Sequence, residues 1–93
     1  MPLLMRFKVR DRSMEPALRE GDYVLVSSVP FMVRRPAAGD IVVARHKGMF
    51  VIKRIRETEG DVYTLLGDNP HGSGFRVPKK AIVGKVVLHV RKK

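Results

Sequence analysis

A Gly-Asp pair followed by an apolar run recurs three times in this chain, and it constrains the fold more than any other feature. The pairs stand before Tyr23-Val24-Leu25-Val26, Ile41-Val42-Val43-Ala44 and Val62-Tyr63, as Gly21-Asp22, Gly39-Asp40 and Gly60-Asp61. Glycine and aspartate favour turns, whereas β-branched and aromatic residues favour strands. Each pair therefore predicts a turn that enters a short strand. We interpret the recurrence as turn punctuation and not as a structural repeat.

Other segments add strands and leave little room for helix. Alternating apolar and basic residues predict a strand over Met5–Arg10, and Met49–Arg56 is expected to pair with the Ile41 strand across His46-Lys47-Gly48. Ala81–Val90 predicts a closing strand, and a short helical turn is expected over Ser13–Glu20. Pro- and Gly-rich loops are expected at residues 27–38 and 68–80. The prediction is a mainly β fold: a single compact coiled antiparallel sheet, barrel-like, with little helix.

Composition limits the partners. The 93 residues suit one small domain without cysteine, and no apolar stretch approaches the roughly 20 residues that span a bilayer. We therefore expect no membrane span and a cytoplasmic protein, with membrane-surface association as an alternative. The net charge of +10 favours acidic partners. Nucleic acid is the less favoured of these, because aromatics are 6% and Trp is absent. His46, His71 and His89 lie on separate segments, so neither a metal nor another cofactor is expected.

Two residues 40 positions apart, Ser13 and Lys53, suggest chemistry. A serine hydroxyl is a poor nucleophile until a base removes its proton, and a neutral lysine amine can be that base in a desolvated site. Strand alternation places Lys53 on one face with Met49, Val51 and Ile55. A lysine among apolar neighbours either extends its amine to the strand edge or is held neutral by desolvation. The spacing alone leaves both alternatives open.

Four ordered motifs give these residues a context: Ser13-Met14-Glu15-Pro16-Ala17-Leu18, Gly39-Asp40-Ile41-Val42-Val43, Ile52-Lys53-Arg54 and Gly67-Asp68-Asn69-Pro70. In order and approximate spacing they resemble the type I signal peptidases and the self-cleaving domains of SOS-type repressors, over nearly the whole chain. The resemblance implies that Ser13 is the nucleophile, that Lys53 is its general base and that the Ser13 N–H belongs to the oxyanion hole. It also implies that Ser73 orients the lysine amine and that Met14 packs beside the site.

The chain departs from the family pattern at several positions. Asp11 stands where the family has Gly or Ser, and an ionised carboxylate cannot donate to an oxyanion. Either Asp11 points away from the site or the oxyanion hole differs. The segment Gly74-Phe75-Arg76 lacks the acid of the usual Asp-Ser-Arg element, so Arg76 must find another partner or solvent. Ala17 replaces the usual threonine.

The compact chain most resembles the small maturation proteases of nickel-type superoxide dismutases. We expect residues 1–93 to form a single Ser-Lys peptidase domain without a transmembrane anchor or a DNA-binding domain. The expected function is a serine endopeptidase that removes an N-terminal propeptide or signal-type segment, bound as an extended strand. Two alternatives stay open: the core of a membrane-associated signal peptidase, and a basic, non-enzymatic β-barrel that binds nucleic acid.

Overall fold

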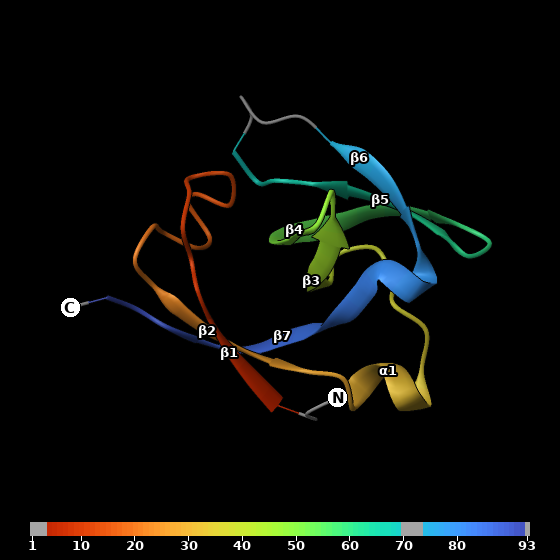
Figure 1. The fold of residues 1–93 in the computed structure, drawn as a ribbon, viewed down its shortest axis with the longest axis horizontal. Helices are drawn as coiled ribbons and strands as arrows, with labels where there is room; N and C mark the ends of the chain where they lie inside the picture. The colour runs from red at the N-terminus through yellow and green to blue at the C-terminus, as the bar shows by residue number, and fades with distance from the viewer. Residues whose placement is uncertain (1–3, 70–73, 93) are drawn as a thin grey trace.

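A computed structural model describes residues 4–69 and 74–92 of the chain. Its strands form one antiparallel sheet in the order β1-β2-β7-β3-β4-β5-β6, which curls on itself into a half-barrel (Figure 1). Strand residues make up 53% and helical residues 8%, so the mainly β prediction is confirmed. The elements are β1 (Leu4–Lys8), β2 (Tyr23–Ser27), α1 (Pro30–Val33), β3 (Ile41–His46), β4 (Met49–Glu59), β5 (Val62–Leu66), β6 (Phe75–Pro78), the 3₁₀ turn η1 (Lys79–Ala81) and β7 (Ile82–Val90).

The Gly-Asp turns lie where the sequence places them. Gly21, Gly39 and Gly60 have φ angles of 93°, 97° and 59°, in the region that glycine enters without steric cost. Each is followed within two residues by the start of β2, β3 or β5. The β3–β4 hairpin has the expected register, from Ile41 opposite Arg54 to His46 opposite Met49.

Three sequence expectations differ from the structure. Strand β7 does not close the sheet but lies in its middle, between β2 and β3. The predicted loop over residues 68–80 contains the edge strand β6, whose short apolar alternation is masked by flanking glycine and proline. The loop predicted at residues 27–38 contains the short helix α1. The short helical turn expected over Ser13–Glu20 is confirmed, because the Leu18 N–H donates to the Met14 carbonyl at 3.0 Å, the bond of one helical turn.

The sheet has a hydrophobic cluster on each face. The first cluster contains Val9, Met14, Leu18, Val24, Val26 and Val43. The second contains Val42, Ala44, Ile55, Tyr63, Leu65 and Val77. Because alternate residues of a strand point to opposite faces, β3 contributes Val43 to the first cluster and its neighbours Val42 and Ala44 to the second. We call the parts of the protein around these clusters the first lobe (β1, β2 and the turns at residues 9–22) and the second lobe (residues 34–40, β4 from Lys53 onward, β5 with its continuation to Asn69, and β6).

Strand β1 and the first half of β4 each have an edge without a strand partner in the described part of the chain. Strand β1 pairs with β2 on one side only. Strand β4 pairs with β3 from Met49 onward, but its ladder with β5 begins at Arg54. The first half of β4 therefore has one free edge, and so does β1. Such edges present backbone groups that can pair with an added strand.

Candidate active site

Ser13 lies half-buried in the turns between β1 and β2. The next residue, Met14, is 1% exposed and belongs to the first hydrophobic cluster. Burial of this large side chain fixes the turn against the sheet. The buried Met14 side chain therefore anchors the backbone next to the candidate nucleophile.

The segment after β5 holds the Ser13 backbone from the other side. The Asn69 N–H donates to the Ser13 carbonyl at 2.8 Å, and Asn69 Nδ2 donates to the Arg12 carbonyl at 3.1 Å. Gly67 is buried and packs so closely that an added Cβ would lie 2.3 Å from the Ser13 carbonyl oxygen. Figure 1 shows the turns after β1 beside the end of β5. Residues more than 50 positions apart in the sequence therefore meet at Ser13.

Lys53 lies on the strand next to this segment. Its partner across the β3–β4 ladder is Val42, which is fully buried in the second cluster, and Lys53 itself is half-buried. Arg54 and Leu66 form the pair at one end of the β4–β5 ladder. Lys53 precedes Arg54 and Gly67 follows Leu66, so both residues stand just beyond that end of the ladder. Lys53 makes no hydrogen bond or ion pair with another described residue. Gly67 thus links the two candidate catalytic residues: it contacts Ser13 and follows the ladder pair beside Lys53.

Asp11 does not point away from the site. Its Oδ1 accepts hydrogen bonds from the Ser13 N–H at 3.0 Å and from Ser13 Oγ at 2.9 Å. The Asp11 carboxylate therefore forms hydrogen bonds with both Ser13 groups to which the resemblance gives a catalytic role. These are the hydroxyl that attacks and the N–H of the oxyanion hole. The alternative in which Asp11 points away from the site is therefore wrong.

Arg54 is an anchor for the segment that holds Ser13. Its Nε and Nη2 donate to the two carboxylate oxygens of Asp68 at 2.8 and 2.7 Å, and its Nη1 donates to the Gly39 carbonyl at 2.9 Å. The hydrogen bond to Asp68 raises the pKa of Arg54 above its ordinary value. A two-point arginine–carboxylate pair fixes geometry better than a single contact. The sequence motifs did not predict the pairing of Arg54 with Asp68. The available signal was that the two residues stand in motifs at the ends of adjacent strands.

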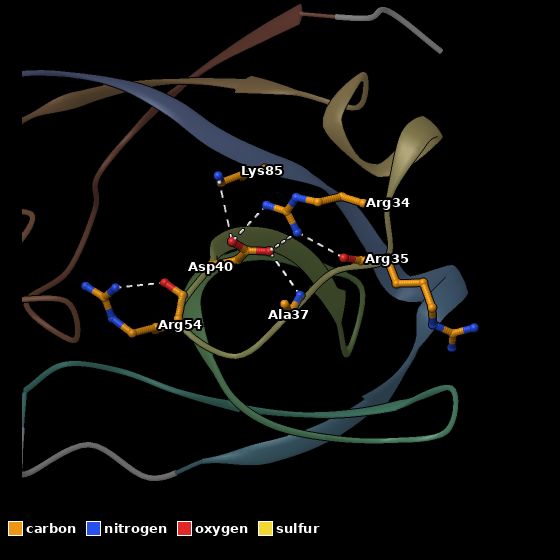
Figure 2. Close-up of polar contacts among 7 residues, drawn as sticks. Arg34, Arg35, Ala37, Asp40, Arg54 and Lys85 are labelled. Atoms are coloured by element: carbon orange, nitrogen blue, oxygen red, sulfur yellow. Dashed lines mark hydrogen bonds and ion pairs between the residues drawn. The ribbon is translucent and has the colours of Figure 1, made fainter.

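A second carboxylate, Asp40, stands at the entrance to β3. Figure 2 shows it surrounded by Arg34, Ala37 and Lys85. Arg34 donates to both of its oxygens at 3.0 and 3.1 Å, and Lys85 Nζ lies 3.7 Å away. Burial favours the neutral form of Asp40, but the hydrogen bonds from Arg34 and Ala37 and the nearby cations outweigh it and lower its pKa. This network ties the loop after α1 to the sheet and offers no free group for chemistry.

Asp22, at the entrance to β2, is the buried acid of the first lobe, with 3% exposure. It accepts hydrogen bonds from the backbone N–H groups of Lys92 at 2.9 Å and Arg19 at 3.0 Å, and His89 Nε2 lies 2.7 Å from its Oδ2. These contacts, in that order of importance, hold the pKa of Asp22 far below its usual range. Asp22 thereby connects the turns after Ser13 with the end of β7.

A groove of about 550 Å³ runs between the two free strand edges and reaches the turn that carries Ser13. One wall is β1 and its continuation to Asp11, and the other is the β3–β4 turn with the first residues of β4. Phe7 and Phe50 meet edge to face across it, with ring centroids 5.5 Å apart. Its lining residues are Arg6, Phe7, Lys8, Val9, Arg10, Asp11, Met14, Gly48, Met49, Phe50, Val51 and Ile52.

Arg76 and His46, which the sequence also singles out, have contacts away from this site. Ser73 and His71 lie outside the described residues. Arg76 has Glu59 as its partner at 3.8 Å, His46 stacks on Phe75, and no group of acidic, histidine or cysteine side chains in the described ranges is arranged to hold a metal. Among residues 4–69 and 74–92, no helix has the length and apolar character needed to cross a bilayer.

Comparison with known proteins places this arrangement in a family. The Peptidase S24-like family model matches residues 3–87. The LexA repressors of Streptomyces avermitilis and Streptomyces coelicolor are each 36% identical to this chain over 89 residues. Both alignments cover 90% of this chain and 34% of the repressor. The chain thus spans about a third of the length of the curated relatives it matches.

Proposed function

Because this chain belongs to the Peptidase S24-like family, we propose that it is a serine endopeptidase in which Ser13 is the nucleophile and Lys53 the general base. In the proposed reaction, the neutral Lys53 amine accepts the hydroxyl proton while Ser13 Oγ attacks the carbonyl carbon of the scissile bond. The lysine then returns the proton to the leaving amine, and water hydrolyses the acyl-enzyme ester.

One observation carries the proposal: the Ser13 backbone is clamped by Gly67 and Asn69 next to the point where Lys53 stands on β4. The four family motifs are separate in the sequence, and three of them meet here. A clamp on both sides of a nucleophile supports catalysis because chemistry at a serine depends on position within fractions of an ångström. Ser73 is proposed as a further contact that orients the Lys53 amine.

The contact between Asp11 and Ser13 implies a resting arrangement. While Asp11 accepts the Ser13 hydroxyl and N–H, neither can serve the substrate. We infer that substrate entry displaces the exposed Asp11 side chain. The Ser13 N–H is then free to stabilise the oxyanion, a contribution that typically changes kcat by about 10²- to 10³-fold.

The groove between the β1 and β4 edges is the proposed substrate site. An extended peptide can pair its backbone with a free strand edge while alternate side chains enter the groove. The apolar lining supports a peptide substrate, and the groove ends at Asp11 and Met14 beside the nucleophile. A propeptide or a signal-type segment of another protein is the proposed substrate, and residues 1–93 act as one catalytic domain.

The test is cleavage by purified protein with Ser13→Ala as the comparison. Peptide libraries read by mass spectrometry identify a cleaved bond, and the variant is assayed on that peptide. Loss of the nucleophile of a serine protease lowers kcat by on the order of 10⁶-fold, so we expect no measurable cleavage and an unchanged melting temperature. A variant that keeps more than about a tenth of the activity contradicts the role of Ser13.

Nucleic-acid binding is the second candidate function. The net charge of +10 and the repressor name of the two relatives favour it. A mobility-shift experiment with labelled DNA distinguishes the two functions. A salt-dependent shift that Ser13→Ala leaves unchanged, from a protein that cleaves no peptide, supports nucleic-acid binding. The Peptidase S24-like family model matches residues 3–87, whereas the alignment covers only a third of each repressor, so the comparisons support the peptidase better than DNA binding.

A further inference from the structure

The cations of β1 differ from most arginines of the second lobe because they have no acidic partner in the part of the chain that the structure describes. Arg34, Arg35, Arg54 and Arg76 each form an ion pair with an aspartate or a glutamate. By contrast, the exposed β1 side and its continuation present Arg6, Lys8 and Arg10, which form no ion pair with the described residues. Arg6 lies over the Tyr23 ring, 5.0 Å from its centroid.

These three cations line the groove on one side. The single acidic residue of the lining, Asp11, already accepts two hydrogen bonds from Ser13. The other wall contributes apolar side chains, and Arg45 lies over the Phe50 ring at 5.0 Å to its centroid. The groove therefore combines an apolar floor with an uncompensated positive rim.

Charged and apolar side chains alternate along β1 and its continuation. Arg6, Lys8 and Arg10 alternate with Phe7 and Val9, and the first three are exposed while Phe7 is half-buried and Val9 is 3% exposed. When a peptide pairs with an edge strand, residues opposite each other share a face. A peptide along β1 thus presents every second side chain to the cations and the others to the apolar floor.

From this juxtaposition we propose that the groove selects extended peptides in which acidic and apolar residues alternate next to the scissile bond. The inference rests on the proposed peptidase function and names its substrate class. A peptide fits better than a nucleic acid strand because the groove lies between two free backbone edges, which pair with another backbone, and because its apolar floor suits Val or Leu side chains.

Binding to the inactive Ser13→Ala protein tests the selectivity apart from catalysis. The probes are fluorescein-labelled peptides with alternating Val and Glu, the same peptide with Gln or Lys in place of Glu, and a peptide of identical composition with Glu and Val in blocks. We expect the alternating Glu peptide to bind about 10-fold more tightly than the Gln and block peptides, with a difference that shrinks at high salt. Equal affinity for the Glu and Gln peptides, or for the alternating and block peptides, overturns the proposal.

A charge swap assigns the effect to β1. Lys8→Glu/Arg10→Glu should reverse the preference so that the Lys peptide binds more tightly than the Glu peptide. The matched control is Lys79→Glu/Lys80→Glu, on η1 away from the groove. Each double variant lowers the net charge from +10 to +6, since every change of a cation to glutamate removes two positive charges. The control should keep the original order of the peptides, and a reversal in the control as well overturns the proposal.

Three further outcomes separate this inference from the peptidase function and from nucleic-acid binding. Peptide binding with the expected order, but without cleavage by the parent protein, supports the groove and counts against the peptidase. Cleavage without charge preference supports the peptidase and overturns the groove inference. A single-stranded DNA oligonucleotide that binds more tightly than the alternating peptide, and loses binding in Lys8→Glu/Arg10→Glu, overturns it in favour of a nucleic-acid groove.

Discussion

The two lobes of this protein use similar strands and similar cations for different purposes. In the second lobe, Arg54 is fixed by Asp68 and Arg76 lies near Glu59. These cations form ion pairs that connect strand ends and turns. In the first lobe, the cations of β1 stay exposed along a groove. The difference shows that the position of carboxylates, more than the number of arginines, decides which part of a basic sheet is scaffold and which can bind a ligand.

The lobes also share the candidate site unequally. The first lobe contributes Ser13 on a turn that Met14 anchors in the core. The second contributes the clamp at Gly67 and Asn69, and Lys53 stands on its face of β4, opposite Val42. The proposed activity therefore depends on the relative position of the two lobes, because neither of them contains both candidate catalytic residues.

The largest expected effect tests whether the second lobe takes part in chemistry or only supports it. Lys53→Met keeps most of the aliphatic stem and removes the amine, so cleavage should fall by at least about 10⁴-fold. The melting temperature should not fall near neutral pH, since the lost amine has no hydrogen-bond partner among the described residues and no longer has to be desolvated.

Peptide cleavage and thermal melting of the same preparations provide the measurement, and Lys79→Met on the exposed η1 turn is the control. Cleavage retained by Lys53→Met would remove Lys53 from the mechanism. Inactivity together with a large loss of stability would instead identify Lys53 as a structural donor.

The next effect concerns the contact where the lobes meet. Gly67→Ala places a methyl group 2.3 Å from the Ser13 carbonyl oxygen, a backbone atom that cannot move aside without shifting the nucleophile. We expect kcat to fall about 100-fold and the free energy of unfolding to fall by about 1–3 kcal/mol. Gly60→Asn is the control, because Gly60 has open space around it and a φ of 59° that asparagine tolerates. Normal kinetics in Gly67→Ala would show that the clamp is dispensable.

A smaller effect, of opposite sign, is expected within the first lobe. Asp11→Ser removes the carboxylate that accepts the Ser13 N–H and hydroxyl, and it restores a residue able to donate to an oxyanion. The value of kcat/KM should rise about 10-fold. Glu15→Ser removes the same charge from the same turns without a bond to Ser13, so it should leave kcat/KM unchanged. A fall in kcat for Asp11→Ser would mean that Asp11 positions the nucleophile productively.

The smallest effect is on the pH dependence of stability. The folded pKa of Asp22 is far below the unfolded value near 3.9, so the unfolded state binds more protons as pH falls. Its contribution is fully present above the unfolded value and is lost as pH falls toward the folded one. Asp22→Asn should therefore melt a few degrees lower than the parent at neutral pH, with a gap that narrows below about pH 4. Asp61→Asn, in an exposed pair with Arg35, should show a smaller gap, and equal gaps would contradict the special role of Asp22.

Sequence patterns predicted most of the fold because strand formation here depends on local features. Alternation over Met5–Arg10 and the Gly-Asp turns fix where β1, β2, β3 and β5 lie, and the hairpin at Lys47-Gly48 fixes the register of β3 against β4. The order of the strands in the sheet could not be predicted from such local features. Strand β7 enters the middle of the sheet and β6 emerges inside a predicted loop, because pairing partners are chosen by long-range packing that no local window contains.

By itself, the sequence determined the mainly β class, the family and the residue types available for chemistry, since these depend on periodicity and on motifs carried by contiguous residues. The tertiary structure decided the rest. It directed the Asp11 carboxylate onto Ser13, paired Arg54 with Asp68 and set Gly67 against the nucleophile. It also left Arg6, Lys8 and Arg10 without an acidic partner among the described residues, along an apolar groove. Each of these contacts joins side chains to groups whose position depends on how the curled sheet brings distant strand ends together, and only the folded chain specifies that geometry.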